Sequence, residues 1–186
     1  MSVSRAVNGF APFLVFFAAL LPAFPAGPDP AFVIRAVLTE PKPTTLSHFG
    51  NSVSLGAPGA KVGDFAGAGA VFLYSAADGS FLRRVVAPAP STVGHFGISV
   101  AVDGRRLLVG SPGTAEGGIR GAGACFLFDA EGKIVAELSD PQPTAFAGFG
   151  RSVDIRGKLV IAGEYAANVG DADNAGKAIL FEEAAK

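Results

Sequence analysis

The stretch HFGNSV at residues 48–53 occurs three times in this chain of 186 residues. It returns as HFGISV at residues 95–100 and as GFGRSV at residues 148–153. A period of about 50 residues indicates a repeat architecture, in which each copy is one supersecondary unit that stacks on its neighbours. We therefore expect three copies of one unit, and the second copy is the most complete.

Two more features recur with the Phe-Gly pair. A Pro-x-Pro precedes each pair, and a Gly-x-Pro follows the first two pairs, whereas the third copy reads Gly163-Glu164-Tyr165. The first copy has only 6 residues from Gly50 to Gly56, where the other two copies have 13 in the corresponding interval, so we expect a truncated first unit. The Pro-x-Pro motifs lie at residues 41–43, 88–90 and 141–143, and the Gly-x-Pro motifs at residues 56–58 and 110–112.

The second copy predicts four short strands. The first ends at Asp103-Gly104, a strong hairpin signal, and Gly110-Ser111-Pro112 ends the second. The third strand is apolar throughout, which predicts cover on both faces. The predicted strands are Ser99–Val102, Leu107–Val109, Ala124–Phe128 and Ile134–Leu138.

A four-stranded sheet of this size cannot bury both of its faces alone, and radial stacking against neighbouring sheets solves this problem. The fold class that we predict is all-β. It is a β-propeller-like array of three four-stranded antiparallel blades, with the first blade truncated and the ring incomplete or atypically closed. The repeats span residues 41–87, 88–140 and 141–186, within a domain of residues 27–186, and together hold about 11 strands.

The repeat phase also predicts how the array closes. Residues 32–38 match a fourth strand, and the chain stops just after a third strand at Ala178–Phe181. We expect Val33–Leu38 to pair antiparallel with Ala178–Phe181, because this pairing covers two open sheet edges. Closure by a second copy, an arc of a longer parent protein and an atypical three-sheet ring remain as alternatives.

Residues 1–26 have the layout of a secretory signal peptide. Arg5 precedes an apolar run from Phe10 to Phe24, and small residues follow. The run is shorter than a bilayer-spanning helix and contains Pro12 and Pro22. An uncleaved membrane anchor and a buried strand are the alternatives.

The bulk composition excludes several function classes. The formal net charge is -1 and no basic run of five residues exists, so we expect no nucleic-acid partner. Apolar residues make up 49% and charged residues 17% of the chain, which argues against disorder. Cys125 is the single cysteine, so no intrachain disulfide can form.

The repeated Phe-Gly-x-Ser-Val, the Gly-x-Pro and the stretch GAVFLY at residues 69–74 together resemble the FG-GAP repeat. Such repeats build the seven-bladed propeller of integrin α subunits and occur in many bacterial secreted or surface proteins. The resemblance implies an extracellular binding or adhesion module.

Integrin-type repeats often hold calcium in the hairpin between the first two strands. Here that hairpin, Asp103-Gly104 or Arg156-Gly157, is too short for the six to eight oxygen ligands that calcium takes. The acidic loop with Asp171, Asp173 and Asn174 reads as a solvated turn. We expect no metal, no cofactor and no calcium dependence of stability.

No pattern indicates catalysis. His48 and His95 occupy one repeat position, and so do Ser52, Ser99 and Ser152, which indicates architecture because catalysis needs one convergent site. The Gly-Ala-Gly stretches at 67–69 and 121–123 precede strands and lack the helix that binds phosphate.

We expect the remaining repeated and singular residues to be structural. Cys125 reads as a core residue, and each Phe of the pairs (Phe49, Phe96 and Phe149) as an anchor of its blade in a neighbour. A solvent-facing aromatic ring for sugars is the alternative for these phenylalanines.

The sequence thus predicts a secreted or cell-surface, non-catalytic binding or adhesion module rather than an enzyme. Its partner would be a protein or a glycan, and it could associate with further blades or with a second copy. The membrane would be reached only through an uncleaved N-terminal segment. The alternatives are an accessory propeller of a surface hydrolase system and a non-functional fragment of a longer propeller protein.

Overall fold

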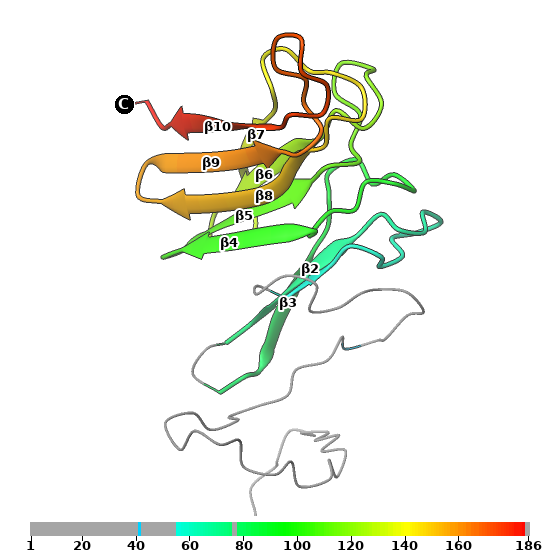
Figure 1. Cartoon of the computed structure of the whole chain (residues 1–186). Coiled ribbons are helices and arrows are strands. Elements are labelled where there is room, and N and C mark those ends of the chain that lie inside the picture. Colours follow the sequence, from blue (N-terminus) through cyan, green and yellow to red (C-terminus); the bar gives the residue numbers. More distant parts are fainter. Residues whose placement is uncertain (1–40, 42–54, 76–77, 185–186) are drawn as a thin grey trace, which may run out of the picture. The chain divides into compact units, whose positions relative to one another are not determined.

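The computed structural model describes residue 41 and residues 55–75 and 78–184 (Figure 1). These residues form ten strands in three antiparallel sheets, and none of them is helical. No helix able to cross a bilayer occurs among them. The predicted signal peptide, the pairing of Val33–Leu38, and His48, Phe49 and Ser52 lie outside the described residues.

The middle sheet confirms all four strands predicted for the second repeat. It has the order β4-β5-β6-β7. Two details of the prediction were wrong. Asp103 pairs with Arg106, so the turn residues are Gly104 and Arg105, and the second strand continues through Gly110 and Ser111 because both pair with the third strand. The strands are β4 Ser99–Asp103, β5 Arg106–Ser111, β6 Ala124–Phe128 and β7 Ile134–Leu138.

The flanking sheets follow the same plan with three described strands each. The first sheet has the order β1-β2-β3 and the third has the order β10-β9-β8. The register shifts in the pairing of β2 with β3 and of β6 with β7 at equivalent points, after Leu73 and Leu127. The strands are β1 Gly56–Ala57, β2 Ala70–Tyr74, β3 Phe81–Val85, β8 Phe149–Arg156, β9 Leu159–Glu164 and β10 Lys177–Glu182.

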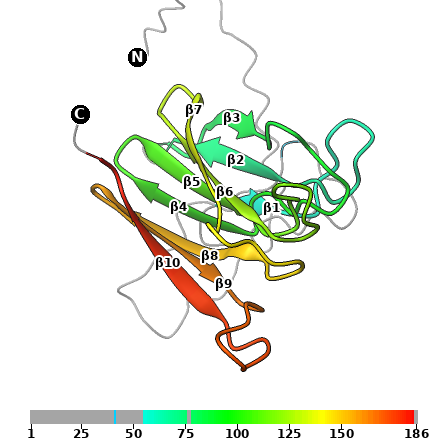
Figure 2. The same ribbon diagram turned by 90° about the horizontal axis from the view of Figure 1, so that it is seen from above.

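The middle sheet is buried on both faces, as its apolar third strand predicted. Side chains alternate across a strand, so Val109 and Phe126 pack toward Val71 of the first sheet. Leu108 and Leu127 pack instead among residues of the third sheet, which include Ile155, Val160 and Ala162. Figure 2 shows β4, β5 and β6 between β2 on one side and β8 on the other. The described residues form an open stack of sheets and no closed ring.

The Phe-Gly pairs join successive repeats, as predicted for Phe96 and Phe149. Both side chains are fully buried. The Phe96 N–H donates to Ala68 O at 3.0 Å, and the Phe149 N–H donates to Ala122 O at 2.8 Å. The Phe96 ring lies 5.8 Å from the Phe126 ring, within aromatic contact distance. Each phenylalanine therefore covers one sheet while its backbone holds the preceding repeat.

The backbones of successive repeats come too close for any side chain at two glycines. Gly69 and Gly123 form parallel bridges with Phe96 and Phe149. Their φ angles are +88° and +93°, in the left-handed region that favours glycine. A Cβ at Gly123 would overlap the backbone of Phe149, and Gly69 stands in the same relation to Phe96.

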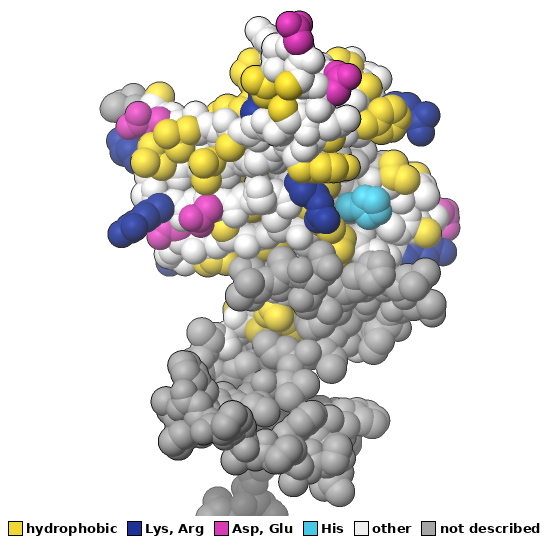
Figure 3. All heavy atoms as spheres, in the orientation of Figure 1, with side chains coloured by type: hydrophobic (Ala, Val, Ile, Leu, Met, Phe, Trp, Pro, Cys, Tyr) yellow, Lys and Arg dark blue, Asp and Glu magenta, His cyan; other side chains and the backbone are white. Residues whose placement is uncertain are grey.

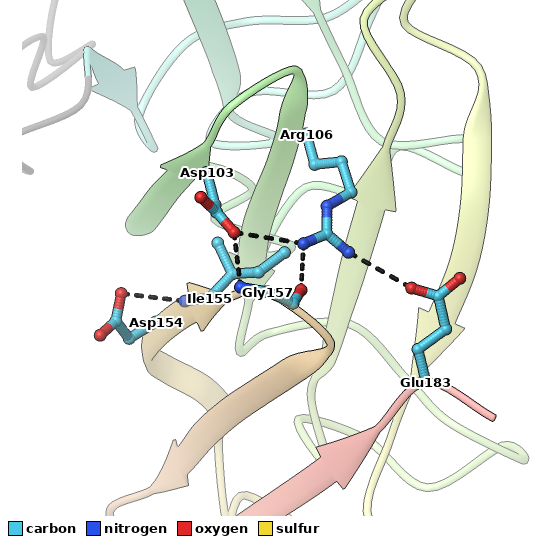
Figure 4. Close-up of polar contacts among 6 residues, drawn as sticks. All are labelled: Asp103, Arg106, Asp154, Ile155, Gly157 and Glu183. Carbon is cyan, nitrogen blue, oxygen red and sulfur yellow. Dashed lines mark hydrogen bonds and ion pairs between the residues drawn. The ribbon is translucent and has the colours of Figure 1, made fainter. Parts of the chain in front are cut away.

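A second contact joins the hairpins of the middle and third sheets (Figure 4). The Gly157 N–H donates to Asp103 Oδ2 at 2.6 Å, and the Arg106 guanidinium donates to Gly157 O. Arg106 also pairs with Asp103 at 3.2 Å and with Glu183 at 3.3 Å. The side chains of Asp103 and Arg106 provide hydrogen-bond partners for the backbone of Gly157, in the turn between β8 and β9. They hold this turn against the turn between β4 and β5.

Substitution Gly123→Ala should destabilise the chain strongly, because the new methyl group would meet the Phe149 backbone. Gly117→Ala is the matched control, since Gly117 has a φ of +58° with no atom near its Cβ position. We expect the control to lose about 1–2 kcal/mol of unfolding free energy from backbone strain, and Gly123→Ala to lose roughly 3 kcal/mol or more. Urea denaturation followed by circular dichroism measures both. Equal losses would show that the contact between repeats contributes little.

Candidate binding cleft

A cleft of about 860 Å³ lies where the loops of the three repeats meet. Each repeat contributes its Gly-x-Pro position, namely Pro58, Pro112 and Tyr165. The second and third repeats add the residues around their Phe-Gly pairs. The repeated motifs that build the stack therefore also form the walls of the cleft.

The most unusual residue in the cleft is Phe146. Its side chain is 63% exposed, although a phenylalanine is usually buried. Its φ is +62°, which a bulky residue adopts only under strain. The Phe146 N–H donates to Arg120 O at 2.9 Å, and the Arg120 guanidinium lies 5.9 Å from the ring centre. Strained residues cluster at ligand-binding positions, so Phe146 marks this cleft as a candidate site.

The described lining of the cleft is basic. It contains His95, Arg120 and Arg151 and no Asp or Glu. His95 has a φ of +52°, and the equivalent position of the third repeat is Gly148 with a φ of +72°. In Figure 3 the histidine side chain, in cyan, lies at the surface beside a Lys or Arg side chain and near hydrophobic ones. The cleft thus combines positive charge with exposed aromatic surface.

The other described residues singled out in the sequence lie in the core, in strands or on loops. The Ser99 hydroxyl donates to Gly150 O of the next repeat at 2.8 Å, whereas Ser152 is exposed on β8. The expected core role of Cys125 is confirmed, since the thiol is buried and burial raises its pKa well above the usual range. The Gly-Ala-Gly stretches lead into β2 and β6, as predicted. Asp171 and Asp173 are exposed on a loop.

A largely buried ionic cluster joins Asp140, the last residue of the second repeat, to Glu164 and Lys177 of the third; the Lys177 side chain is 31% exposed. Lys177 Nζ lies 2.6 Å from Asp140 Oδ2 and 3.2 Å from Glu164 Oε2. Glu164 and Lys177 are a cross-strand pair of β9 and β10. The equivalent pairs are Ser111 with Ala124 in the middle sheet and Ala57 with Ala70 in the first. One repeat therefore has an ion pair at a position where the others have small residues.

The pKa values of Glu164 and Lys177 are both raised, but for different reasons. Desolvation raises the pKa of Glu164, and the nearby Asp140 carboxylate raises it further. The hydrogen bond to Asp140 is the main reason that the pKa of Lys177 is raised. Neither Glu164 oxygen makes a hydrogen bond of good geometry, so its ion pair with Lys177 only partly offsets the cost of burial.

Sequence reasoning did not identify Phe146, Arg120 or the buried cluster. Alignment of the repeats contained a signal for the cluster, because Glu164 replaces the central residue of Gly-x-Pro and Lys177 replaces an alanine. It contained no signal for Phe146, since its exposure and φ depend on the loop conformation. Comparison with protein-family models and with curated proteins found no match for this chain.

Glu164→Gln should change how stability depends on pH. Because the folded pKa of Glu164 is raised, the folded wild type binds a proton more tightly than the unfolded chain. Its free energy of unfolding therefore falls as pH rises from the ordinary Glu pKa of about 4.3 to the raised folded value. The glutamine variant lacks this loss, so its stability relative to the wild type should increase through that window.

Urea denaturation at a series of pH values tests this expectation. Glu137→Gln is the control, since it removes a carboxylate from an exposed position of β7. Parallel pH profiles for the wild type and Glu164→Gln would show that folding does not raise the pKa of Glu164.

Proposed function

We propose that the chain is an FG-GAP-type repeat protein whose sheets act as propeller blades. The support is the way each Phe-Gly pair docks on the Gly-Ala-Gly stretch of the preceding repeat. The same hydrogen bond and the same left-handed glycine occur at both described junctions. A sheet buried on both faces by its neighbours in the chain is the arrangement that propeller blades use.

We further propose that the protein is a secreted or cell-surface binding module without catalytic activity, and that its partner occupies the cleft. Phe146 is the observation that supports the cleft most strongly, because a strained and exposed aromatic residue has a cost in a free monomer. A bound partner would bury this ring and the neighbouring Tyr165, which is also exposed. Aromatic residues and Arg are enriched where binding energy concentrates in interfaces.

The charge of the described lining favours an acidic protein or glycan. His95 and Arg120 come from two separate loops and Arg151 from β8, and all three line one cleft. Arg side chains bind carboxylate and sulfate-like groups with two parallel hydrogen bonds. Acidic sugars therefore fit this lining better than neutral ones, and acidic peptide segments satisfy the same chemistry.

Binding of the labelled protein to an array of acidic and neutral glycans, and to immobilised acidic peptides, tests the proposal. We expect Phe146→Ala and Arg151→Glu each to weaken binding at least about tenfold, which corresponds to about 1.4 kcal/mol. Phe65→Ala is the matched control, since Phe65 is an exposed phenylalanine that does not line the cleft. Binding that Phe65→Ala reduces as much as Phe146→Ala does would place the partner elsewhere.

A further inference from the structure

The junction between the second and third repeats has two carboxyl groups that share one ammonium group. Lys177 Nζ contacts Asp140 of the second repeat at 2.6 Å and Glu164 of the third at 3.2 Å. The side chains of Asp140 and Glu164 are 5% and 0% exposed. At the junction between the first and second repeats the equivalent of Asp140 is Ala87, which also precedes a Pro-x-Pro and is buried. The second junction therefore carries an ionic contact where the first has an alanine.

Glu164 also lies within hydrogen-bonding reach of the Asp140 carboxyl group. Two ionised carboxylates have only acceptor oxygens, so neither can donate to the other. The ionised Glu164 side chain accordingly leaves both of its buried oxygens without a hydrogen-bond partner. A proton on Glu164 supplies the missing donor, and Asp140 can accept it while keeping its contacts with Lys177 and the Gln142 N–H. The proton also removes one of two adjacent negative charges, which is how paired carboxyl groups usually respond to a shared site.

Asp140 and Lys177 are the charged groups, among the described residues, that act on Glu164. Asp140 follows β7 and Lys177 begins β10, while β8 places Phe149, which does not titrate, opposite Glu164. The three side chains of the cluster are neutral in sum when Glu164 is protonated, and they carry one negative charge when it is not. An uncompensated charge is costly in a site of this burial. The charged side chains of β8 are exposed, namely Arg151, Asp154 and Arg156.

We propose that a single proton, shared between Glu164 and Asp140, joins the second and third repeats, and that its loss weakens this junction. When the proton leaves, the O–H bond of Glu164 breaks, the proton passes to water, and two carboxylates compete for Lys177. The opening equilibrium of the junction should rise about tenfold per pH unit between the ordinary Glu pKa of about 4.3 and the raised pKa of Glu164 in the folded chain. Above that window it should level off. This inference rests on the packing of the repeats and does not depend on the ligand of the cleft.

Cys125 is a natural reporter of this opening. It is the single cysteine of the chain, and its buried thiol packs between the middle and third sheets with Phe149 and Ile155. Labelling by a dipyridyl disulfide, which reacts with thiols in acid as well as at neutral pH, measures how often the sheets separate. Dividing each rate by that of the urea-unfolded chain at the same pH removes the pH dependence of the thiol itself. The relative rate should rise through the window in the wild type and stay constant in Glu164→Gln, whose amide can donate to Asp140 at every pH.

A second reporter separates opening of this junction from unfolding of the whole stack. Val109 is fully buried and packs toward the first sheet, so Val109→Cys in a Cys125→Ala background reports on the first junction. Its relative labelling rate should not change through the window, because no member of the cluster lies at that junction. An equal pH dependence at the two positions would overturn the proposal.

Carbon NMR of the carboxyl groups tests the shared proton directly. The Glu164 Cδ and Asp140 Cγ signals should titrate together in one step above the ordinary Glu range, because a shared proton belongs to the pair. Asp140→Ala copies the first junction and should lower the Glu164 midpoint by roughly one pH unit or more, since it removes the adjacent charge and the acceptor. Asp171→Ala is the matched control, because it removes an exposed carboxylate of the same repeat, and it should leave the midpoint unchanged.

Three results would overturn the proposal whatever the variants do to stability. They are a wild-type Glu164 midpoint in the ordinary range, a midpoint that Asp140→Ala does not lower, and the same Cys125 labelling profile for the wild type and Glu164→Gln. The first of these needs no variant. Circular dichroism of each variant establishes that the fold is intact.

Discussion

The close approach of backbones at Gly69 and Gly123 is the constraint on which the rest of the structure depends. At both points the backbone of a phenylalanine of the next repeat lies directly against the glycine, and the phenylalanine N–H donates to the carbonyl of the alanine that precedes the glycine. These contacts are made by the main chain, so they depend on the absence of a side chain rather than on a particular one. They fix the distance between sheets, and the apolar side chains then fill the space between them.

The same spacing explains where the cleft lies. The loops that precede the second and third Phe-Gly pairs and those that follow β1, β5 and β9 line one cleft, so the repeats bring Pro58, Pro112 and Tyr165 together. A cleft made in this way has a wall from every repeat. His95 and Arg151 line this cleft from positions beside the Phe-Gly pairs.

Much of the fold was predictable from the sequence, because the repeats report the same pattern several times. The strands of the middle sheet, the burial of Phe96 and Phe149 and the core position of Cys125 all follow from periodicity and residue type. The turn at Gly104 and Arg105 does not follow from periodicity and residue type, because the Asp103 side chain accepts a hydrogen bond from Gly157 of another sheet. The exposure of Phe146 and the meeting of Asp140 with Lys177 likewise depend on contacts between residues distant in the chain.

The linear order of the sheets has a consequence for how the molecule opens. In the described part of the chain the middle sheet has two neighbours, whereas the third sheet has one. In stacked repeats stability is close to a sum of repeat terms and nearest-neighbour interface terms, so opening is easiest where a sheet has a single interface. Amide protons of β5 and β6 should then exchange only through unfolding of the whole stack, and those of β10 through local fraying. The molecule would behave as a short cooperative array with a stable centre.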